Sequence, residues 1–301
     1  MTAETMRQGF VRVATEALDG HPKVAVVLAD ITTQQFRESG ALARHPDRVI
    51  NAGIREQLMV SVAAGMALEG MRPIAHSFAP FLIERAFEQV KLDFAHQGVG
   101  GVLVSIGASY DIGAYGRTHH CPEDVALMAT LPGWRIHVPG HPAEAEALLR
   151  DAIASEDSIY IRLSERENRE PVPTGAGLAT IRSGSTGAVT IIAVGPMLDP
   201  TVESLADIDA TILYTSTVRP FDATGLRAAA AGTDIVLIEP YLEGTSASEV
   251  SAALSDRPHR LLSIGVPRVE HRRYGSAASH DRAHGLDADG LRARITAWLG
   301  R

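Results

Sequence analysis

Short runs of mostly apolar residues recur along the sequence, and they limit the possible folds more than any other feature. Runs of this length, without regular polar alternation, are typical of strands buried on both faces of a parallel sheet. We therefore expect several buried strands. The runs are Val24–Ala29, Val102–Ile106, Ile159–Leu163, Val189–Val194, Thr211–Leu213 and Ile235–Ile238.

Segments with helical spacing separate these runs. In the first of them, Met6, Phe10 and Val13 fall on one face of a helix. Alternation of strands and helices predicts an α/β fold, in which mainly parallel sheets are flanked by helices. Further helical segments are 54–68, 79–95, 142–153 and 289–299.

The composition changes between Glu165 and Gly187. This stretch is rich in charged residues, proline and glycine and has little periodicity, so we expect a linker with room for one edge strand. The predicted division is a first domain over residues 1–166, a linker over 167–187 and a second domain over 188–301. Both domains have an ordinary size.

Charge and cysteine content restrict the classes of function. The net charge of −8 disfavours nucleic acid or an anionic membrane surface as the main partner. Cys121 is the single cysteine, so no internal disulfide is possible. The N-terminus lacks a secretory pattern, and the most apolar stretch, 58–68, is too short to cross a bilayer. We expect a soluble, cytoplasmic protein.

Glu56 is the first candidate for chemistry. It follows a strand-like segment, Arg48–Ile50, and opens the apolar helix expected over 54–68. A glutamate in a first helical turn can simply stabilise the helix terminus. This helix is apolar almost all round, however, so its N-terminus should meet a buried surface, where an unpartnered carboxylate is costly.

Two further segments carry candidate side chains. Phe78 and Phe81 stand three residues apart at a strand-to-helix junction and can form a flat apolar wall, although ordinary core packing explains them equally well. The segment 110–124 follows a predicted strand, where α/β proteins place ligand loops. Its crowded histidines, thiol and carboxylates fit a metal site poorly. His119 is a better candidate for hydrogen bonding or proton transfer.

Three arginines lie near predicted strand and helix ends. Ion pairing at the surface is the simple explanation for Arg7, Arg162 and Arg166. Phosphate binding is the sharper hypothesis, because a guanidinium group can bind a phosphate through two parallel hydrogen bonds.

Taken together, these segments resemble the second half of transketolase. That family carries A-D-L-T, then G-[IV]-x-E, then T-F-x-x-F, then a T-H-Q loop, and the same order is found here. The resemblance extends over nearly the whole chain. The matching segments are Leu28–Thr32, Gly53–Glu56, Ser77–Phe81, Thr118–His120, Ser158–Ser164, Thr217–Asp222 and His284–Asp287.

The resemblance implies a thiamine-diphosphate pyrimidine-binding domain followed by a transketolase C-terminal domain. It implies that Glu56 hydrogen-bonds and protonates the N1′ nitrogen of the cofactor's aminopyrimidine, which drives the tautomerism that forms the ylid. A carboxyl group in an apolar pocket has a raised pKa, which suits this role. Phe78 and Phe81 would stack on the pyrimidine.

Other residues receive roles from the same resemblance. Asp30 would lie near the cofactor at a subunit contact, and Arg85 belongs to the cofactor-binding set. His119 would hydrogen-bond the substrate. Further substrate-binding residues implied by the family are Arg7, Tyr110 and Arg166. The implied reaction moves a two-carbon ketol unit from a ketose, or its phosphate, to an aldose.

The G-D-G motif that anchors Mg²⁺ and the diphosphate in this family is absent from the sequence, and Ala288–Gly290 is only a near match. The chain is therefore similar to the small subunit of a split transketolase. A large partner subunit would supply the diphosphate domain and the Mg²⁺ ligands, in an α2β2 assembly with self-association of this chain. The partners expected are this subunit and sugar or sugar-phosphate substrates, without nucleic acid or membrane.

The sequence also departs from the family. Tyr115–Arg117 replaces Asp-Gly-Pro before the Thr-His pair, and the usual Asp reads a sugar hydroxyl, so the donor sugar is left open. Tyr110 stands where transketolase has His and deoxyxylulose-phosphate synthase has Tyr. The alternatives are a deoxyxylulose-phosphate-synthase-like enzyme, the β subunit of a 2-oxo acid dehydrogenase, or a non-catalytic scaffold or regulatory subunit.

Overall fold

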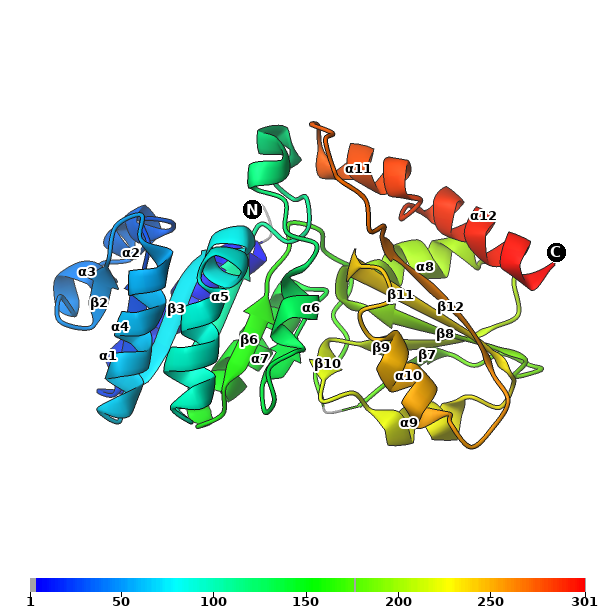
Figure 1. The fold of residues 1–301 in the computed structure, drawn as a ribbon, viewed down its shortest axis with the longest axis horizontal. Coiled ribbons are helices and arrows are strands. Elements are labelled where there is room, and N and C mark those ends of the chain that lie inside the picture. Colours follow the sequence, from blue (N-terminus) through cyan, green and yellow to red (C-terminus); the bar gives the residue numbers. More distant parts are fainter. Residues whose placement is uncertain (1–3, 176, 301) are drawn as a thin grey trace.

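A computed structural model of the chain describes residues 4–175 and 177–300, and it contains two sheets side by side, each covered by helices (Figure 1). The first sheet has the strand order β10-β5-β6-β4-β3-β1-β2. Its strands are β1 (Val24–Leu28), β2 (Val49–Asn51), β3 (Arg72–Phe78), β4 (Val102–Ile106), β5 (Arg135–His137), β6 (Ile159–Arg162) and β10 (Thr217–Arg219). All of its pairings are parallel except that between β10 and β5.

The second sheet has the order β12-β11-β8-β9-β7 and is parallel except for the edge strand β7. Its strands are β7 (Ala179–Arg182), β8 (Val189–Val194), β9 (Thr211–Thr215), β11 (Asp234–Leu242) and β12 (Arg260–Val266). The predicted α/β class with mainly parallel, helix-covered sheets is thus confirmed.

Helices cover both faces of the first sheet. On one face, α1 (Met6–Gly20) and α7 (Pro142–Ala154) pack against β1, β4 and β6. On the other face lie α4 (Glu56–Leu68), the π-helical segments η1 (Pro80–Arg85) and η2 (Val90–His96), and α6 (Asp124–Met128). The shorter helices are α2 (Thr33–Glu38), α3 (Ala41–Arg44), α5 (Phe87–Gln89) and η3 (Gly113–Thr118).

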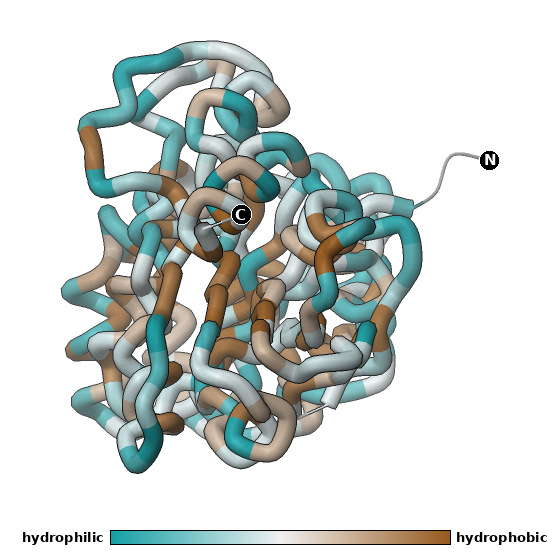
Figure 2. The backbone as a smooth tube through the Cα atoms, turned by 90° about the vertical axis from the view of Figure 1, so that its right-hand side faces the viewer, coloured by the Kyte–Doolittle hydropathy of each residue, from teal (hydrophilic) through white to brown (hydrophobic). Residues whose placement is uncertain are grey.

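The second sheet is covered in the same way. The short helix η4 (Gly195–Met197), α8 (Leu198–Ser204) and α12 (Ala288–Leu299) pack on one face, and α9 (Ala223–Ala229) and α10 (Ala247–Ala253) pack on the other. The helix α11 (Ala277–His284) lies next to α12 in the chain. Along the backbone tube, many of the hydrophobic stretches lie toward the middle of the molecule, and hydrophilic stretches occupy much of its outer bends (Figure 2).

Two features of the fold differ from the sequence expectation. The strand β10 comes from the second half of the chain but pairs with β5 of the first sheet, so the sheets do not follow strictly consecutive segments. The helix expected over 79–95 is broken into η1, α5 and η2. π-helical turns are rare in proteins as a whole, but those that occur are often found at functional sites. The domain limits 1–166, 167–187 and 188–301 stay a prediction.

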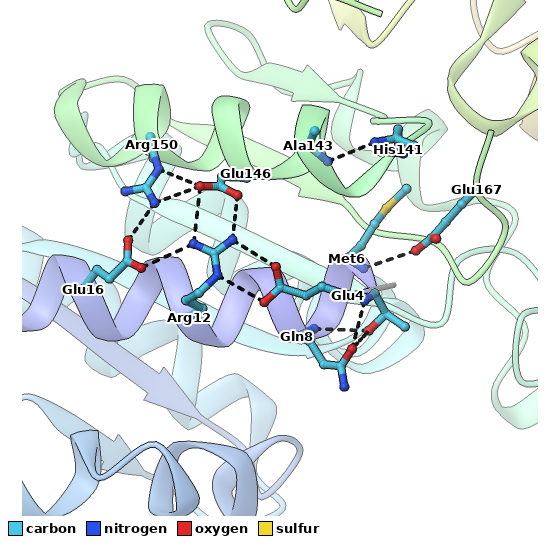
Figure 3. A network of polar contacts seen from close by, with 11 residues as sticks. Glu4, Met6, Gln8, Arg12, Glu16, His141, Ala143, Glu146, Arg150 and Glu167 are labelled. Carbon is cyan, nitrogen blue, oxygen red and sulfur yellow. Dashed lines mark hydrogen bonds and ion pairs between the residues drawn. The ribbon is translucent and has the colours of Figure 1, made fainter. Parts of the chain in front are cut away.

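An exposed ion-pair network joins α1 to α7 (Figure 3). Arg12 contacts Glu4, Glu16 and Glu146, and Arg150 contacts Glu16 and Glu146, with N–O distances from 2.6 to 3.3 Å. Each exposed pair is weak alone, but a network with alternating charges fixes the orientation of two helices better than a single pair. The network therefore helps to hold α1, which carries Arg7, against the sheet.

Candidate active site

The candidate residues collect at the carboxyl edge of the first sheet. Asp30 follows β1, Gly53 and Glu56 follow β2, Phe78 ends β3, and the loop with His119 follows β4. Because parallel strands end at the same edge, residues far apart in the sequence meet there.

Glu56 is the first residue of α4 and is only 1% exposed. Its Oε2 atom lies 2.8 Å from Nη1 of Arg85, whose side chain is 41% exposed. Within the described residues, Oε1 makes no hydrogen bond. The carboxylate thus has one cationic partner and one oxygen left for a ligand. The ion pair with this cation offsets the free-energy cost that an unpartnered buried acid would have.

The two phenylalanines form one wall of the site. Phe78 at the end of β3 and Phe81 in η1 are both half-buried, and their ring centroids are 6.1 Å apart at an angle of 78°. The guanidinium carbon of Arg85 lies 4.1 Å from the centroid of Phe81. Arg85 therefore connects the acid to the aromatic wall by an ion pair on one side and a cation–π contact on the other.

His119 lies against the same wall. Its ring centroid is 5.2 Å from that of Phe81 and 6.0 Å from that of Phe78, and Nδ1 is 2.9 Å from Oγ1 of Thr118. Burial lowers the pKa of His119, and the charge of Arg85 lowers it further. The imidazole is therefore neutral near pH 7, so one ring nitrogen can donate a hydrogen bond while the other accepts one.

Tyr115 extends the aromatic cluster on the other side of His119, with centroids 4.9 Å apart. Its side chain is 65% exposed. The backbone reaches this geometry through Gly116, whose φ is 73° and where any Cβ atom would fall 2.4 Å from the ring of Tyr274. Glycine suits this position because the φ angle lies in a region that residues with a side chain rarely adopt.

Asp30 lies beside the segment that leads into α4. The side chain of Asn51 accepts hydrogen bonds from the backbone N–H groups of Asp30 (2.9 Å) and Gly53 (3.0 Å), so it ties the two loops together. Asp30 is exposed and has a φ of 67°. Non-glycine residues with positive φ are uncommon and concentrate at functional sites. Its predicted position at a subunit contact stays a prediction.

Arg7 projects from α1 toward the loop that follows β1. Its Nε and Nη2 atoms lie 3.2 and 3.1 Å from Oγ1 of Thr32, which in turn is 2.8 Å from Nε2 of the buried His76. Arg7 is half-buried and, among the described residues, has no ion pair with a carboxylate. Its predicted substrate role stays a prediction.

Tyr110 and Arg166 meet on a third residue. The Tyr110 hydroxyl donates to Oδ1 of Asp281 at 2.6 Å, and Arg166 forms an ion pair with the same carboxylate. Tyr110 is only 4% exposed, and its ring stacks on His280 with centroids 4.9 Å apart. Both polar groups are therefore committed to α11 in the second half of the chain, which argues against the substrate roles predicted for these two side chains.

The hypothesis that Arg162 binds a phosphate is wrong. It is 1% exposed and its Nε atom lies 2.7 Å from Oδ2 of Asp124. Its Nη2 atom donates to Ser109, whose hydroxyl donates to the carbonyl of Pro240 at 2.6 Å. The sequence pattern shows only a cation at the end of a mostly apolar strand. In the folded protein this cation is buried and pairs with the carboxylate of Asp124.

Thr32 belongs to the segment that matches A-D-L-T, whereas no signal in the sequence singles out Asn51 or His76; all three contact predicted site residues or their partners. Positive φ at Thr32 and the burial of His76 are visible only in three dimensions. Tyr115 was also missed as a site residue. Two sequence signals point to it: it stands at the position of the Asp in the family's Asp-Gly-Pro, and it lies four positions before His119 in the same loop.

Other parts of the molecule do not add to this site. A cavity of about 820 Å³ lies at the opposite, amino edge of the first sheet, lined by residues such as Lys23, Arg72 and Gly100. Within residues 4–175 and 177–300, no group of three or more His, Cys, Asp or Glu side chains is arranged to hold a metal ion. None of the helices in that part of the chain has the length and apolar character needed to cross a bilayer.

Comparison with known proteins identifies a matching domain family. Residues 3–171 match the model of the transketolase pyrimidine-binding domain. This stretch contains the whole carboxyl edge described above.

Similar chains are found in full-length alignments. An uncharacterized 33.6 kDa protein in the fasciation locus of Rhodococcoides fascians is 48% identical over 98% of this chain and 95% of its own length. One subunit of the apulose-4-phosphate transketolase of Actinobacillus succinogenes is 28% identical over 96% of this chain and 95% of its own. A solved structure described as a split gene transketolase, inactive beta4 tetramer, has a TM-score of 0.81 at 26% identity and covers 97% of both chains.

Proposed function

This chain belongs to the transketolase family and carries its pyrimidine-binding domain, and we propose that it is one subunit of a thiamine-diphosphate-dependent transketolase. In this proposal the enzyme transfers a two-carbon ketol unit from a ketose or ketose phosphate to an aldose. It is active only together with a large partner subunit.

The described residues fit the aminopyrimidine part of the coenzyme. A buried carboxylate with one free oxygen, Glu56, stands next to a half-buried aromatic wall made by Phe78 and Phe81. Such a wall suits a flat ring, and a carboxyl group that carries a proton can donate it in a hydrogen bond to a ring nitrogen. Arg85 would hold the carboxylate in place, and Asp30 would lie at the edge of the cofactor site.

The chemistry supplied by bound thiamine diphosphate is an electron sink that allows the bond next to a ketone carbon to break. In this chain, Glu56 would share its proton with the N1′ nitrogen of the aminopyrimidine. Neutral His119 would orient the substrate oxygens through hydrogen bonds. Arg7 would bind an anionic group of the substrate. The aromatic cluster would exclude water around Glu56 and His119.

The described residues do not fit a magnesium site, because no suitable ligand cluster is found among them. Hard oxygen ligands are needed to hold Mg²⁺ against a diphosphate. We therefore assign these ligands to the partner subunit. A relative that is itself one subunit of a transketolase, and that matches this chain over nearly its full length, supports this division.

Apolar side chains next to Glu56 support a protein contact at the site. Ile54 is 72% exposed and Leu58 is 45% exposed, on either side of the buried acid. Exposed apolar residues that gather at one place commonly mark an interface. The tetramer of the similar split-gene chain supports self-association of this chain, and we propose an α2β2 assembly with the partner.

One observation carries the proposal: the buried Glu56 lies within the same contact network as Phe81 and His119. A scaffold subunit would gain nothing from a buried acid beside an aromatic wall, since the acid costs desolvation free energy.

Co-expression with the partner subunit tests the proposed function. Thiamine diphosphate is titrated, with and without Mg²⁺, into this chain alone, the partner alone and the assembled pair. We expect binding and ketol transfer only for the pair with Mg²⁺. Binding and turnover by the isolated chain would contradict the divided site. Pyruvate as donor separates the alternatives, because a deoxyxylulose-phosphate-synthase-like enzyme or a 2-oxo acid dehydrogenase would decarboxylate it.

A further inference from the structure

Three buried or half-buried side chains, Arg7, Thr32 and His76, form a chain of hydrogen bonds beside the candidate site. We call this chain the relay. Arg7 of α1 contacts Oγ1 of Thr32 through Nε and Nη2, Thr32 contacts Nε2 of His76, and Nδ1 of His76 lies 2.8 Å from the carbonyl oxygen of Val104 in β4. Thr32 is 3% exposed and His76 is fully buried. None of these contacts involves the proposed coenzyme-facing residues, such as Glu56.

The chemistry of the partners fixes the direction of every hydrogen bond. A carbonyl oxygen only accepts, so Nδ1 of His76 carries the proton and donates to Val104. Burial lowers the pKa of His76 to about 3, so the ring is neutral and Nε2 accepts. The Thr32 hydroxyl must then donate to His76, which leaves both of its lone pairs for the two N–H groups of Arg7.

Arg7 keeps unused donors after these contacts. A guanidinium group has five N–H bonds, and the relay occupies one on Nε and one on Nη2. Arg162 and Arg166 each have a carboxylate partner, whereas Arg7 has none among the described residues. Burial lowers the pKa of Arg7, and the more distant charge of Glu165 raises it only in part. A half-buried cation of this kind favours an anionic ligand.

The backbone at Thr32 is strained in order to make this arrangement. Its φ is 68°, in the left-handed region that β-branched residues strongly avoid. On α1, Phe10 lies one turn after Arg7 and packs against His76 in a tilted arrangement, with centroids 4.3 Å apart at an angle of 32°. Helix α1 thus contacts both ends of the relay, so neither the imidazole nor the guanidinium group can rotate freely.

We infer that His76 and Thr32 are positioning residues that hold the Arg7 guanidinium group for the phosphate of a phosphorylated ketose. This inference rests on the proposed function, because it concerns the substrate of the same site. The fixed tautomer of His76 makes Thr32 an acceptor toward Arg7, and the remaining N–H groups form a planar fork that matches two phosphate oxygens.

The matched variants Thr32→Val, Thr32→Ser and Thr33→Val test the relay in the assembled holoenzyme. Thr32→Val removes the hydroxyl at nearly constant shape, and Thr32→Ser keeps it. Thr33 is the control, because it is also buried and its hydroxyl has no partner among the described residues. Donors are a ketopentose phosphate and the same ketopentose without phosphate.

For Thr32→Val we expect KM for the phosphorylated donor to rise about 10- to 100-fold, with kcat changed by less than about threefold. KM for the unphosphorylated donor should not change, and Thr32→Ser and Thr33→Val should behave like the wild type. Equal changes in KM for both donors would show a merely structural role and overturn the inference.

Calorimetric titration with inorganic phosphate separates this inference from the proposed reaction. We expect Thr32→Val to weaken phosphate binding to the assembled protein, while Thr33→Val retains it. If neither ketose is turned over but this pattern is found, the relay stands and the proposed reaction falls. If phosphate does not bind, or binds Thr32→Val as tightly as Thr33→Val, the inference is overturned.

Discussion

The Nη1 atom of Arg85 lies 2.8 Å from Oε2 of Glu56, and the same guanidinium group covers the ring of Phe81 at 4.1 Å. One exposed cation therefore serves both the buried acid and the aromatic wall. This contact explains how a carboxylate can be tolerated at the start of an apolar helix, because its charge is balanced at the mouth of the site.

Replacement of Arg85 should destabilise the site more than an ordinary surface substitution. Arg85→Met leaves the Glu56 carboxylate buried without a cation, so we expect the free energy of unfolding to fall by about 1–2 kcal/mol, a value discounted for the exposure of Arg85. Urea unfolding measures the change. Arg55→Met is the control, because Arg55 is exposed and makes no side-chain ion pair within the described residues. Equal stability of the two variants would contradict a structural role for the pair.

Tyr110→Phe distinguishes a contact between the two halves of the chain from a substrate contact. The hydroxyl donates to Asp281, and burial raises the pKa of Tyr110 to about 12, so this donor is present at all ordinary pH values. We expect a loss of about 1–2 kcal/mol in the free energy of unfolding and no change in KM. Tyr115→Phe, with an exposed ring, is the control for stability. A raised KM with unchanged stability would restore Tyr110 as a substrate-binding residue.

The buried His76 predicts a specific pH dependence of stability. Its pKa is lowered to about 3 in the folded protein, with burial and the charge of Arg7 disfavouring the protonated ring and the Val104 carbonyl favouring it. The unfolded chain takes up this proton near pH 6.5, so the folded state loses stability as pH falls from about 6.5 toward 3.

His76→Gln removes this contribution. We expect the unfolding free energy of the wild type to fall more steeply than that of the variant, by up to about 1.4 kcal/mol per pH unit around pH 5. Comparison of the two slopes cancels the other titrating groups. Identical slopes would mean that His76 is protonated equally in both states.

Much of the fold follows from the pattern of apolar runs. The runs predicted at Val24–Ala29, Val102–Ile106 and Val189–Val194 correspond to β1, β4 and β8, because strands buried on both faces need nearly continuous apolar sequence. The strand β10 was not predicted, since three residues with an antiparallel partner across the boundary carry no such signal.

The candidate site, like the fold, could be predicted from the sequence only in part. Glu56, Phe78, Phe81 and His119 can be selected from the sequence, and the structure brings them together with Arg85. Single residues cannot reveal their partners, however. Arg162 and Arg166 resemble Arg7 in sequence terms, and only the fold shows that Asp124 and Asp281 neutralise the first two. The roles of the selected residues stay predictions.

Ketol transfer by Glu56→Gln in the assembled holoenzyme tests the central claim most directly. Glutamine keeps the shape of the side chain but cannot share a proton, and Glu69→Gln is the control, because Glu69 is an exposed acid at the other end of α4. We predict that Glu56→Gln assembles normally and loses about 10²- to 10⁴-fold in kcat, while Glu69→Gln keeps full activity. Turnover by Glu56→Gln at the rate of the control would contradict the account.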